Sequence, residues 1–350
     1  MSLRQILFAP AAFLWGMVLR ARHLLYDEGV MKTHRAQIPA IVIGNLELGG
    51  TGKTPHLEWV VRALEGSVPL ATLSRGYGRE GTTFHEVQAT DTASRSGDEP
   101  LQIKHKFPGV RVFVGADRVQ AITRIRALAP EIRAIVLDDA FQHRRLKAHF
   151  NILLTTWDRP WNRDALLPAG RLRDLPARAA AAQAVIVTKC PGIPDAPAME
   201  RWRNELGLLP HQELFFSVLE HAPAKWLNNP EQWHLVPDGA EASALLVTGI
   251  ARPAPLLEHV RRHWGRVEHM AFADHHAYTA RDAARLAERY ANFARQPGVL
   301  LTTEKDVPRL APYIQGPLAQ IPIAVVPVAV RILNQPERLH AQLRSLVGTH

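Results

Sequence analysis

The chain has only one cysteine, Cys190, among its 350 residues. A single thiol cannot form an intramolecular disulfide, so a small scaffold held together by disulfides is excluded. The length is sufficient for about two domains with large hydrophobic cores. A protein that needs no disulfide is typical of a reducing compartment, and we therefore expect the cytoplasm.

No apolar run is long enough to span a bilayer. The longest covers residues 6–19, and as a helix it would measure about 21 Å against a hydrocarbon core of roughly 30 Å. Arg20, Arg22 and His23 follow it, where a signal peptide would have a cleavage site of small residues. We expect a helix over residues 1–26. It fits two arrangements equally well: lying in the headgroup region of an anionic membrane, or packing on the protein's own core.

Acidic residues are outnumbered by basic ones, 33 against 42, which gives a net charge of +9 and a pI near 10.0. Such a protein is attracted to phosphates, whether in nucleic acid, anionic lipid or a phosphorylated metabolite. No recognition helix or platform of aromatic and basic residues is evident, so we do not expect a nucleic-acid partner. The contents of 47% hydrophobic and 21% charged residues are typical of a folded protein.

Strands and helices alternate along most of the chain. A first series, from about residue 38 to 213, predicts a doubly wound parallel sheet. A second series begins at "ALLVTGI" (244–250) and ends with "IPIAVVPVAV" (321–330) as one closing strand. We predict an α/β protein with an N-terminal helix (1–26), a core domain like that of phosphate-loop NTPases (27–214), a linker (215–229) and a smaller α/β domain (230–350).

The first predicted strand leads into a glycine-rich loop, "IVIGNLELGGTGKTP". Backbone N–H groups of such a loop surround phosphates, the lysine contacts the β- and γ-phosphates, and the threonine holds magnesium. The strict motif is not met, because Glu47 replaces its first glycine, and a simple glycine-rich turn with an exposed lysine is the alternative. The predicted ATP-binding residues are Gly49, Gly50, Thr51, Gly52, Lys53 and Thr54.

Two aspartates, Asp138 and Asp139, end the strand in "AIVLDDAFQHRR". Carboxylates at the end of a neighbouring strand are where a second magnesium contact is needed, and together with Thr54 they form the predicted Mg²⁺ site. "TKCP" (188–191) is similar to the base-reading loop of GTP-binding proteins, but Pro191 stands where the guanine-reading aspartate is required. ATP is therefore favoured over GTP.

Eight short motifs occur in a fixed order along nearly the whole chain. They are "GNLELGGTGKTP", "SRGYGR", "SGDEP", "VGADR", "LDDAFQHR", "LLPAGRLRD", "FADHH" and "TTEKD". With these motifs the sequence resembles the tetraacyldisaccharide 4'-kinase family. The resemblance implies transfer of the γ-phosphate of ATP to the 4'-hydroxyl of tetraacyldisaccharide 1-phosphate, an acylated precursor of lipid A. It also implies a peripheral or monotopic protein on anionic lipid, at the cytoplasmic face of the inner membrane of a Gram-negative bacterium.

The resemblance further implies that Asp98 is the general base, that His275 assists it, and that Lys53 takes part in catalysis. A carboxylate can accept the proton of a sugar hydroxyl as phosphoryl transfer proceeds. The pair lies 177 positions apart, in different predicted domains, which must close to assemble it. From spacing alone, Asp98 also fits a helix cap, and His275 also fits a surface histidine.

Arg75, Arg79, Arg118 and His143 are the candidates for gripping the substrate, because arginine matches phosphate geometry with two donors. Each arginine fits a solvated surface charge about as well. Two motifs depart from the family pattern: Ala140 replaces a usual glycine, and Arg171 and Asp174 replace a proline and a glutamate. The roles of Arg171, Arg173 and Asp174 therefore stay open. The alternative function is a membrane-associated phosphate-loop ATPase that acts as a partner switch.

Overall fold

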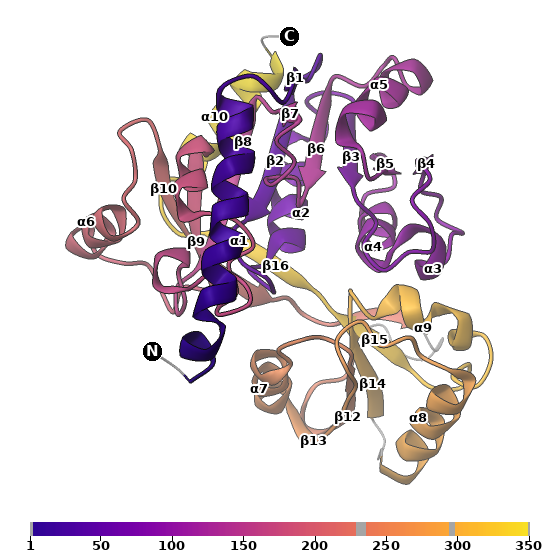
Figure 1. The fold of residues 1–350 in the computed structure, drawn as a ribbon. Coiled ribbons are helices and arrows are strands. Elements are labelled where there is room, and N and C mark those ends of the chain that lie inside the picture. Colours follow the sequence, from indigo (N-terminus) through magenta and orange to yellow (C-terminus); the bar gives the residue numbers. More distant parts are fainter. Residues whose placement is uncertain (1–2, 229–235, 294–297, 349–350) are drawn as a thin grey trace.

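A nine-stranded sheet forms the centre of the larger lobe in the computed structural model, which describes residues 3–228, 236–293 and 298–348 (Figure 1). The strand order is β16-β10-β9-β8-β2-β6-β3-β5-β4, and only the two edge strands, β16 and β4, run antiparallel to their neighbours. The strands are β2 (Ala40–Asn45), β3 (Leu70–Ser74), β4 (His85–Glu86), β5 (Arg111–Val114), β6 (Ala134–Asp138), β8 (Phe150–Thr156), β9 (Ala184–Thr188), β10 (Glu213–His221) and β16 (Val328–Ile332).

Helices cover both faces of this sheet because its central strands are apolar on both sides, as in β2, where every residue is buried. One core contains side chains of α2 (Lys53–Leu64), α4 (Asp98–Lys106) and α10 (Pro336–Gly348). The core on the other face contains side chains of α5 (Arg118–Leu128) and α6 (Ala196–Glu205). The predicted doubly wound sheet is confirmed.

The smaller lobe is built on a five-stranded sheet in the order β11-β15-β14-β12-β13. Its strands are β11 (Lys225–Asn228), β12 (Gly239–Thr248), β13 (Trp264–Ala271), β14 (Gly298–Thr303) and β15 (Ile323–Val326), and its helices are α7 (Ala254–His263), α8 (Ala280–Phe293) and α9 (Val307–Ile314). One core lies under α8 and α9 and the other under α7. The short remaining elements are β1 (His34–Arg35), β7 (Leu146–Lys147), α3 (Ala93–Ser96) and the 3-10 helices Trp161–Arg163 and Pro176–Ala181.

Two segments differ from the expected arrangement. The single closing strand predicted over 321–330 is two strands, β15 in the small sheet and β16 in the large one, separated by Pro327. The expected linker, 215–229, is not irregular: most of β10 and all of β11 lie in it, and the chain passes between the sheets at 222–224, while Asn229 is outside the described residues. Because α10 follows β16, the C-terminal end of the chain packs on α2 in the larger lobe rather than in the smaller one.

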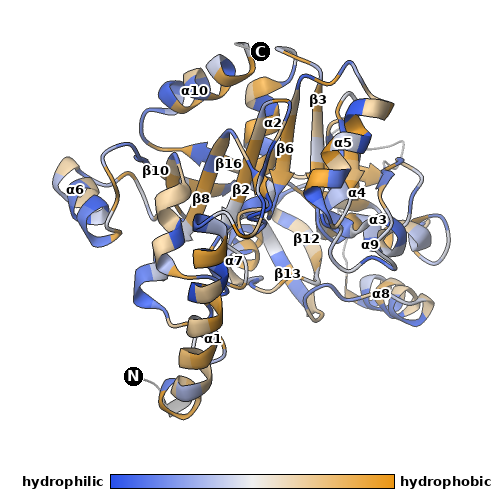
Figure 2. Ribbon diagram, turned by 45° about the horizontal axis from the view of Figure 1, so that its top comes forward, coloured by the Kyte–Doolittle hydropathy of each residue, from blue (hydrophilic) through white to orange (hydrophobic). Residues whose placement is uncertain are grey.

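The N-terminal helix α1 (Leu3–Asp27) lies beside the larger lobe and contacts it along one narrow strip. Ala12, Leu19, His23 and Tyr26 are buried in that strip. The rest of the surface of α1 is rich in exposed apolar side chains. Figure 2 shows many hydrophobic residues along this projecting helix. No helix in the described ranges combines the length and hydrophobicity that crossing a membrane requires.

Candidate active site

The glycine-rich loop connects the end of β2 to the start of α2, as the sequence predicts. Gly49 and Gly52 have φ values of 99° and 91° in the left-handed region, which glycine adopts without the strain that a β-carbon adds. Gly52 immediately precedes α2, so the loop opens onto the N-terminus of that helix. A helix N-terminus with free N–H groups beside it is suited to binding anions such as phosphates.

Neighbouring strands hold the loop from behind. The hydroxyl of Thr188 donates to the carbonyl of Thr51 across 2.8 Å, and Lys189 Nζ donates to the carbonyl of Gly50 across 2.6 Å. On α2, His56 Nδ1 donates to the carbonyl of Gly52 across 2.7 Å, and Nε2 lies 2.9 Å from the hydroxyl of Ser217. Burial lowers the pKa of His56 to about 4, so the imidazole is neutral and can accept from the serine.

Glu47, which breaks the strict motif, points inward. It is 2% exposed and accepts a hydrogen bond from the hydroxyl of Thr155 across 3.2 Å. Burial raises its pKa to about 7. Glu47 also pairs through a β-bridge with Leu172, and the backbone N–H of Leu48 donates to the carbonyl of Arg171 across 2.8 Å. The departure from the motif therefore anchors the loop to the segment 171–173.

Lys53 and Asp139 face each other beside the glycine-rich loop. Lys53 Nζ lies 3.8 Å from Oδ2 of Asp139 and 3.3 Å from Oδ1 of Asn45. Arg173 donates to both carboxylate oxygens of Asp139, one of them across 2.8 Å. Burial by itself would raise the pKa of Asp139, but the hydrogen bonds from Arg173 and the charge of Lys53 outweigh it and lower that pKa. Asp139 is thus ionised and already paired with cations.

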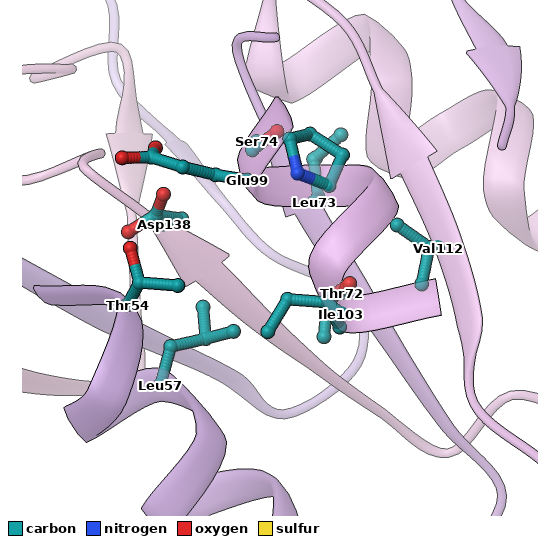
Figure 3. A pocket seen from close by; sticks show the side chains of 10 residues that line it. Thr54, Leu57, Thr72, Leu73, Ser74, Glu99, Ile103, Val112 and Asp138 are labelled. Carbon is teal, nitrogen blue, oxygen red and sulfur yellow. The ribbon is translucent and has the colours of Figure 1, made fainter. Parts of the chain in front are cut away.

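Asp138 has a different environment. Figure 3 shows its carboxylate beside the Thr54 hydroxyl and the Glu99 carboxylate in one small pocket, which all three line. Asp138 Oδ1 is buried and has no hydrogen-bond partner among the described residues. Burial, reinforced by the charges of Glu99 and Asp139, raises the pKa of Asp138 to about 7, and burial raises the pKa of Glu99. The charges of Lys53 and Arg118 near Asp138, and of Lys305 and Lys53 near Glu99, do not outweigh this effect.

Within the described residues, no group of three or more His, Cys, Asp or Glu side chains is arranged to hold a metal ion. Mg²⁺ does not require such a cage, because it keeps several water ligands and is bound through one or two carboxylates together with substrate phosphates. Thr54, Asp138 and Glu99 supply the oxygen atoms that this cation prefers, and the unpaired Asp138 Oδ1 fits such a ligand.

The two lobes meet at Asp98 and His275. Asp98 is the first residue of α4, is 6% exposed, and its Oδ2 lies 3.0 Å from Nδ1 of His275. Burial would raise the pKa of Asp98, but the hydrogen bond from His275 and the charges of His275, Lys305 and Arg309 outweigh it and lower that pKa. The hydrogen bond with Asp98 in turn raises the pKa of His275. The structure brings the pair into contact, and Asp98 Oδ1 also accepts a hydrogen bond from the backbone N–H of Glu99 across 3.0 Å.

Lys305, from the motif "TTEKD", completes a chain of three side chains. Its Nζ lies 2.9 Å from Nε2 of His275. An ammonium group has no lone pair and can only donate, so Nε2 is the acceptor and the imidazole proton resides on Nδ1, toward Asp98. The partners of the ring thus select one tautomer of a neutral His275.

The remainder of "TTEKD" anchors the loop that carries His275. Asp306 accepts hydrogen bonds from the backbone N–H of Gly249 across 3.1 Å and from Tyr278 across 3.1 Å. It also pairs with Arg309 at 3.0 Å, and Arg309 Nε lies 3.7 Å from Oδ2 of Asp98. His275 itself has φ 58°, in the left-handed region, and its N–H donates to the carbonyl of Gly249 across 3.2 Å. This network fixes the position of the imidazole.

The four candidate substrate-binding residues differ in their exposure and in their hydrogen-bond partners. Arg118 is 3% exposed and donates to the carbonyls of Gly115 and Ala116, and burial lowers its pKa to about 10. Arg79 donates to the carbonyl of Thr83 across 2.6 Å. The hydrogen bonds from Arg118 and Arg79 to backbone carbonyls stabilise loops. His143 Nε2 lies 4.0 Å from Asp117, and burial lowers the pKa of His143 to about 4. Arg75 is exposed, and its charge adds to the lowering of the pKa of Arg118.

Sequence reasoning did not identify Glu99, Arg173 and Lys305 as site residues. Glu99 directly follows Asp98 in "SGDEP", and Lys305 stands in "TTEKD", so both lie in motifs that carried the resemblance. Arg173 lies in "LLPAGRLRD", a motif whose departure from the family pattern leaves the role of this arginine open. The motif that contains each residue could have indicated that it belongs to the site. Only the neighbours of the residue in the folded protein indicate what it does there.

Comparison with known proteins identifies the family of the chain. The family model described as tetraacyldisaccharide-1-P 4'-kinase matches residues 4–348. A protein of Bacteroides fragilis (strain YCH46) named tetraacyldisaccharide 4'-kinase is 39% identical over 308 residues, which cover 86% of this chain and 81% of that protein. A protein of the same name from Flavobacterium johnsoniae is 38% identical over 308 residues, 88% of each chain.

The crystal structure of LpxK from Aquifex aeolicus in complex with ATP has the same fold. Its TM-score is 0.75 with 23% sequence identity, and the match covers 98% of this chain and 99% of that one. The family model and the relatives both span most of the sequence. The chain therefore belongs to the tetraacyldisaccharide 4'-kinase family.

Proposed function

We propose that this protein transfers the γ-phosphate of ATP to the 4'-hydroxyl of tetraacyldisaccharide 1-phosphate, giving the bis-phosphorylated precursor of lipid A. The observation that carries the proposal is the contact between Asp98 and His275 directly beside Glu99, which shares a pocket with Thr54 and Asp138. A base for a hydroxyl and a site for phosphates and a cation are thus adjacent, as phosphoryl transfer requires.

ATP binds with its phosphates in the loop Gly49–Thr54. The positive φ values at Gly49 and Gly52 support inward-facing N–H groups there. Lys53 now lies near Asp139 and Asn45, and its ammonium group contacts the β- and γ-phosphates when these enter. Lys189 and Thr188 keep the loop in this shape through its carbonyls.

Thr54, Asp138 and Glu99 would hold Mg²⁺. The unpaired Asp138 Oδ1 and the raised pKa values of both carboxylates, caused mainly by burial, support these ligands. When bound, the cation neutralises charge on the transferred phosphate. Asp139, which the sequence also predicted as a ligand, instead holds Arg173 and Lys53 in place, because Arg173 already occupies its carboxylate.

Asp98 accepts the proton of the 4'-hydroxyl. The new bond joins that oxygen to the γ-phosphorus, the bond from the γ-phosphorus to the β–γ bridging oxygen breaks, and ADP leaves with the bonding electrons. The lowered pKa of Asp98, in which the His275 hydrogen bond outweighs burial, keeps the carboxylate ionised and able to accept a proton. His275 orients it, and contact between the lobes excludes water as a competing acceptor.

Arg75 binds a phosphate of the acceptor, since it is the exposed one of the three candidate arginines. The acceptor site is lined by Arg79, Arg118 and His143. Hydrogen bonds to backbone carbonyls fix the orientation of Arg79 and Arg118.

The helix α1 places this site on a membrane. Phe13 and Leu14 are 63% and 62% exposed, and they belong to a largely apolar surface on a protein with a net charge of +9. A helix of this kind lies in the headgroup region of anionic lipid with its apolar side toward the acyl chains. The acceptor is itself a lipid, which supports action at a membrane surface. The family resemblance implies a peripheral or monotopic protein at the cytoplasmic face of a Gram-negative inner membrane.

The test is transfer of label from γ-labelled ATP to tetraacyldisaccharide 1-phosphate in detergent micelles with Mg²⁺. We expect label in the lipid with the unmodified protein and with Lys225→Ala, an exposed lysine on β11, and a collapse of transfer with Lys53→Ala and Asp98→Ala. ATP turnover that releases labelled phosphate without labelling the lipid would instead favour the partner-switch ATPase.

A further inference from the structure

Arg173 ties together the ends of two strands at the phosphate site. Besides its two contacts with Asp139, its guanidinium donates to Oδ1 of Asn45 across 2.6 Å and to the Asn45 carbonyl across 3.2 Å. Asn45 Oδ1 also accepts from Lys53. The position of Arg173 therefore determines where Asp139 and Lys53 lie relative to the phosphate loop.

The next residue, Asp174, is fastened to α1. It is 1% exposed, and its Oδ1 accepts a hydrogen bond from His23 Nε2 across 2.6 Å and one from the backbone N–H of Leu175 across 2.8 Å. Its Oδ2 has no hydrogen-bond partner among the described residues. A buried carboxylate with so few donors depends strongly on each of them, because an unsatisfied charge in the interior is costly.

The partners of His23 also select its tautomer. Arg144 donates to His23 Nδ1 across 3.1 Å and to its carbonyl across 3.0 Å. Because Nδ1 accepts, the ring proton resides on Nε2 and points to Asp174. Burial, aided by the charges of Arg178 and Arg144, lowers the pKa of His23 despite the hydrogen bond with Asp174. The neutral ring is a fixed donor.

A second set of contacts runs from α1 to the same strand end. Arg22 donates to the carbonyl of Gln142 across 3.2 Å, and the side chain of Gln142 donates to the carbonyl of Asn45 across 2.7 Å. Both sets of contacts start on one turn of α1 and end at Asn45, the last residue of β2. The position of α1 on the larger lobe is therefore connected to the geometry of the phosphate loop through few side chains.

We infer that His23, on the helix that faces lipid, is a positioning residue for the phosphate site. It holds Asp174, and through the adjacent Arg173 it fixes Asp139 and Lys53 for binding Mg²⁺·ATP. Loss of its donor lets the segment 173–175 shift and loosens the Arg173–Asp139 pair, while the Asp98–His275 pair in the other part of the site is unaffected. This inference rests on the proposed function, since it needs the loop to bind ATP.

The experiment uses the full-length protein in detergent micelles. Calorimetry measures the affinity for Mg²⁺·ADP without acceptor, and steady-state kinetics give KM for ATP and for the lipid acceptor. For His23→Ala we expect the Kd for Mg²⁺·ADP and the KM for ATP to rise about tenfold, because Lys53 and Asp139 lose their fixed positions at the phosphate loop, and coupling through intermediate residues has about this size. The KM for the acceptor should change by less than about twofold, because no contact of His23 reaches Asp98 or His275.

Three further variants sharpen the comparison. His23→Gln should restore most of the affinity, because its amide N–H can donate to Asp174. Asp174→Asn removes the acceptor charge without changing the size of the side chain, and it should weaken nucleotide binding as His23→Ala does, even if the latter folds poorly. His105→Ala is the matched control, because His105 is exposed and its ring contacts only the backbone carbonyl of Ala89 in the described structure.

A lowered Tm with unchanged affinity for Mg²⁺·ADP in both His23→Ala and Asp174→Asn would overturn the inference, since His23 would then only stabilise the fold. Failure of the unmodified protein to bind Mg²⁺·ADP or to label the lipid would overturn the proposed function instead. The two failures are distinguished because the second appears before any variant is compared.

Discussion

Lys305 donates a hydrogen bond to Nε2 of His275 across 2.9 Å. The opposite nitrogen of the same ring donates to Asp98 across 3.0 Å, so a cation, an imidazole and a carboxylate lie in one line of hydrogen bonds. Lys305 also contacts Asp274 at 3.3 Å, which holds the ammonium group in place. The arrangement makes Lys305 a residue that sets the tautomer and orientation of His275 and, through its charge, the pKa of Asp98.

Replacing Lys305 by methionine should change the pH profile of the reaction. The charge of Lys305 contributes to the lowered pKa of Asp98, so its loss raises that pKa. The proposed base Asp98 accepts a proton only when ionised, so the acid limb of kcat/KM moves to higher pH. His275 also loses the hydrogen bond from Lys305 that orients it, and for that reason we expect kcat near pH 7 to fall by roughly tenfold. Lys305→Arg should keep the unmodified profile. An unchanged acid limb in Lys305→Met would show that the lysine has no electrostatic effect on the base.

Replacing Glu99 by glutamine should separate cation binding from proton transfer. Glu99 lines the pocket with Thr54 and Asp138, whereas Asp98 contacts His275. For Glu99→Gln we expect the Mg²⁺ concentration at half-maximal rate to rise by about tenfold or more. For Asp98→Asn we expect kcat to fall by about 10²- to 10⁴-fold with little change in that concentration. Magnesium titrations of both variants check this, and equal Mg²⁺ requirements would remove Glu99 from the ligand set.

His56 should make the free energy of unfolding depend on pH. Its pKa is about 4 in the folded protein because of burial, against 6.5 in the unfolded chain, so the unfolded state takes up the proton more readily. The stability it contributes is complete above pH 6.5 and is lost as the pH falls toward 4. Between pH 7 and pH 5 the loss is about 2 kcal/mol.

Urea unfolding at pH 7 and pH 5 measures this loss. His56→Asn should have lower stability at both values, since the contacts with Gly52 and Ser217 are changed, but a smaller difference between them. The exposed His105, changed to asparagine in the same way, serves as control and should leave the difference as it is. The same difference in His56→Asn as in the unmodified protein would contradict a neutral, buried His56.

A charge on the outer side of α1 should weaken membrane binding without affecting nucleotide binding. Leu14 is 62% exposed. In the proposed membrane-bound state its side chain lies among acyl chains and anionic headgroups, and Leu14→Glu places a carboxylate there. We expect at least a fivefold lower partition coefficient for anionic vesicles, measured by sedimentation, from the loss of about 1 kcal/mol or more of binding free energy. Leu128→Glu, at the end of α5 with Leu128 61% exposed, is the matched control. Equal sedimentation of the two variants would exclude α1 as the docking surface.

Local patterns predicted much of the fold and part of the site. The strand, glycine-rich turn and helix of the phosphate loop are contiguous, and so is the acidic end of β6, so chain order alone places them. The run 321–330 is predicted as one closing strand because it is almost continuously apolar. Pro327 within it signals a break, but the apolar pattern does not reveal that the two halves belong to different sheets.

The amino-acid sequence by itself determined the alternating elements, the phosphate loop and, through the order of its motifs, the family. Only the tertiary structure decided which neighbours each carboxylate has. Asp98 and Glu99 are neighbours in the chain, yet one contacts His275 and the other lines the pocket with Asp138, while Arg173 takes up Asp139. The physical reason is that the charge and role of a carboxyl group depend on burial and on donors brought from distant segments, which no local pattern specifies.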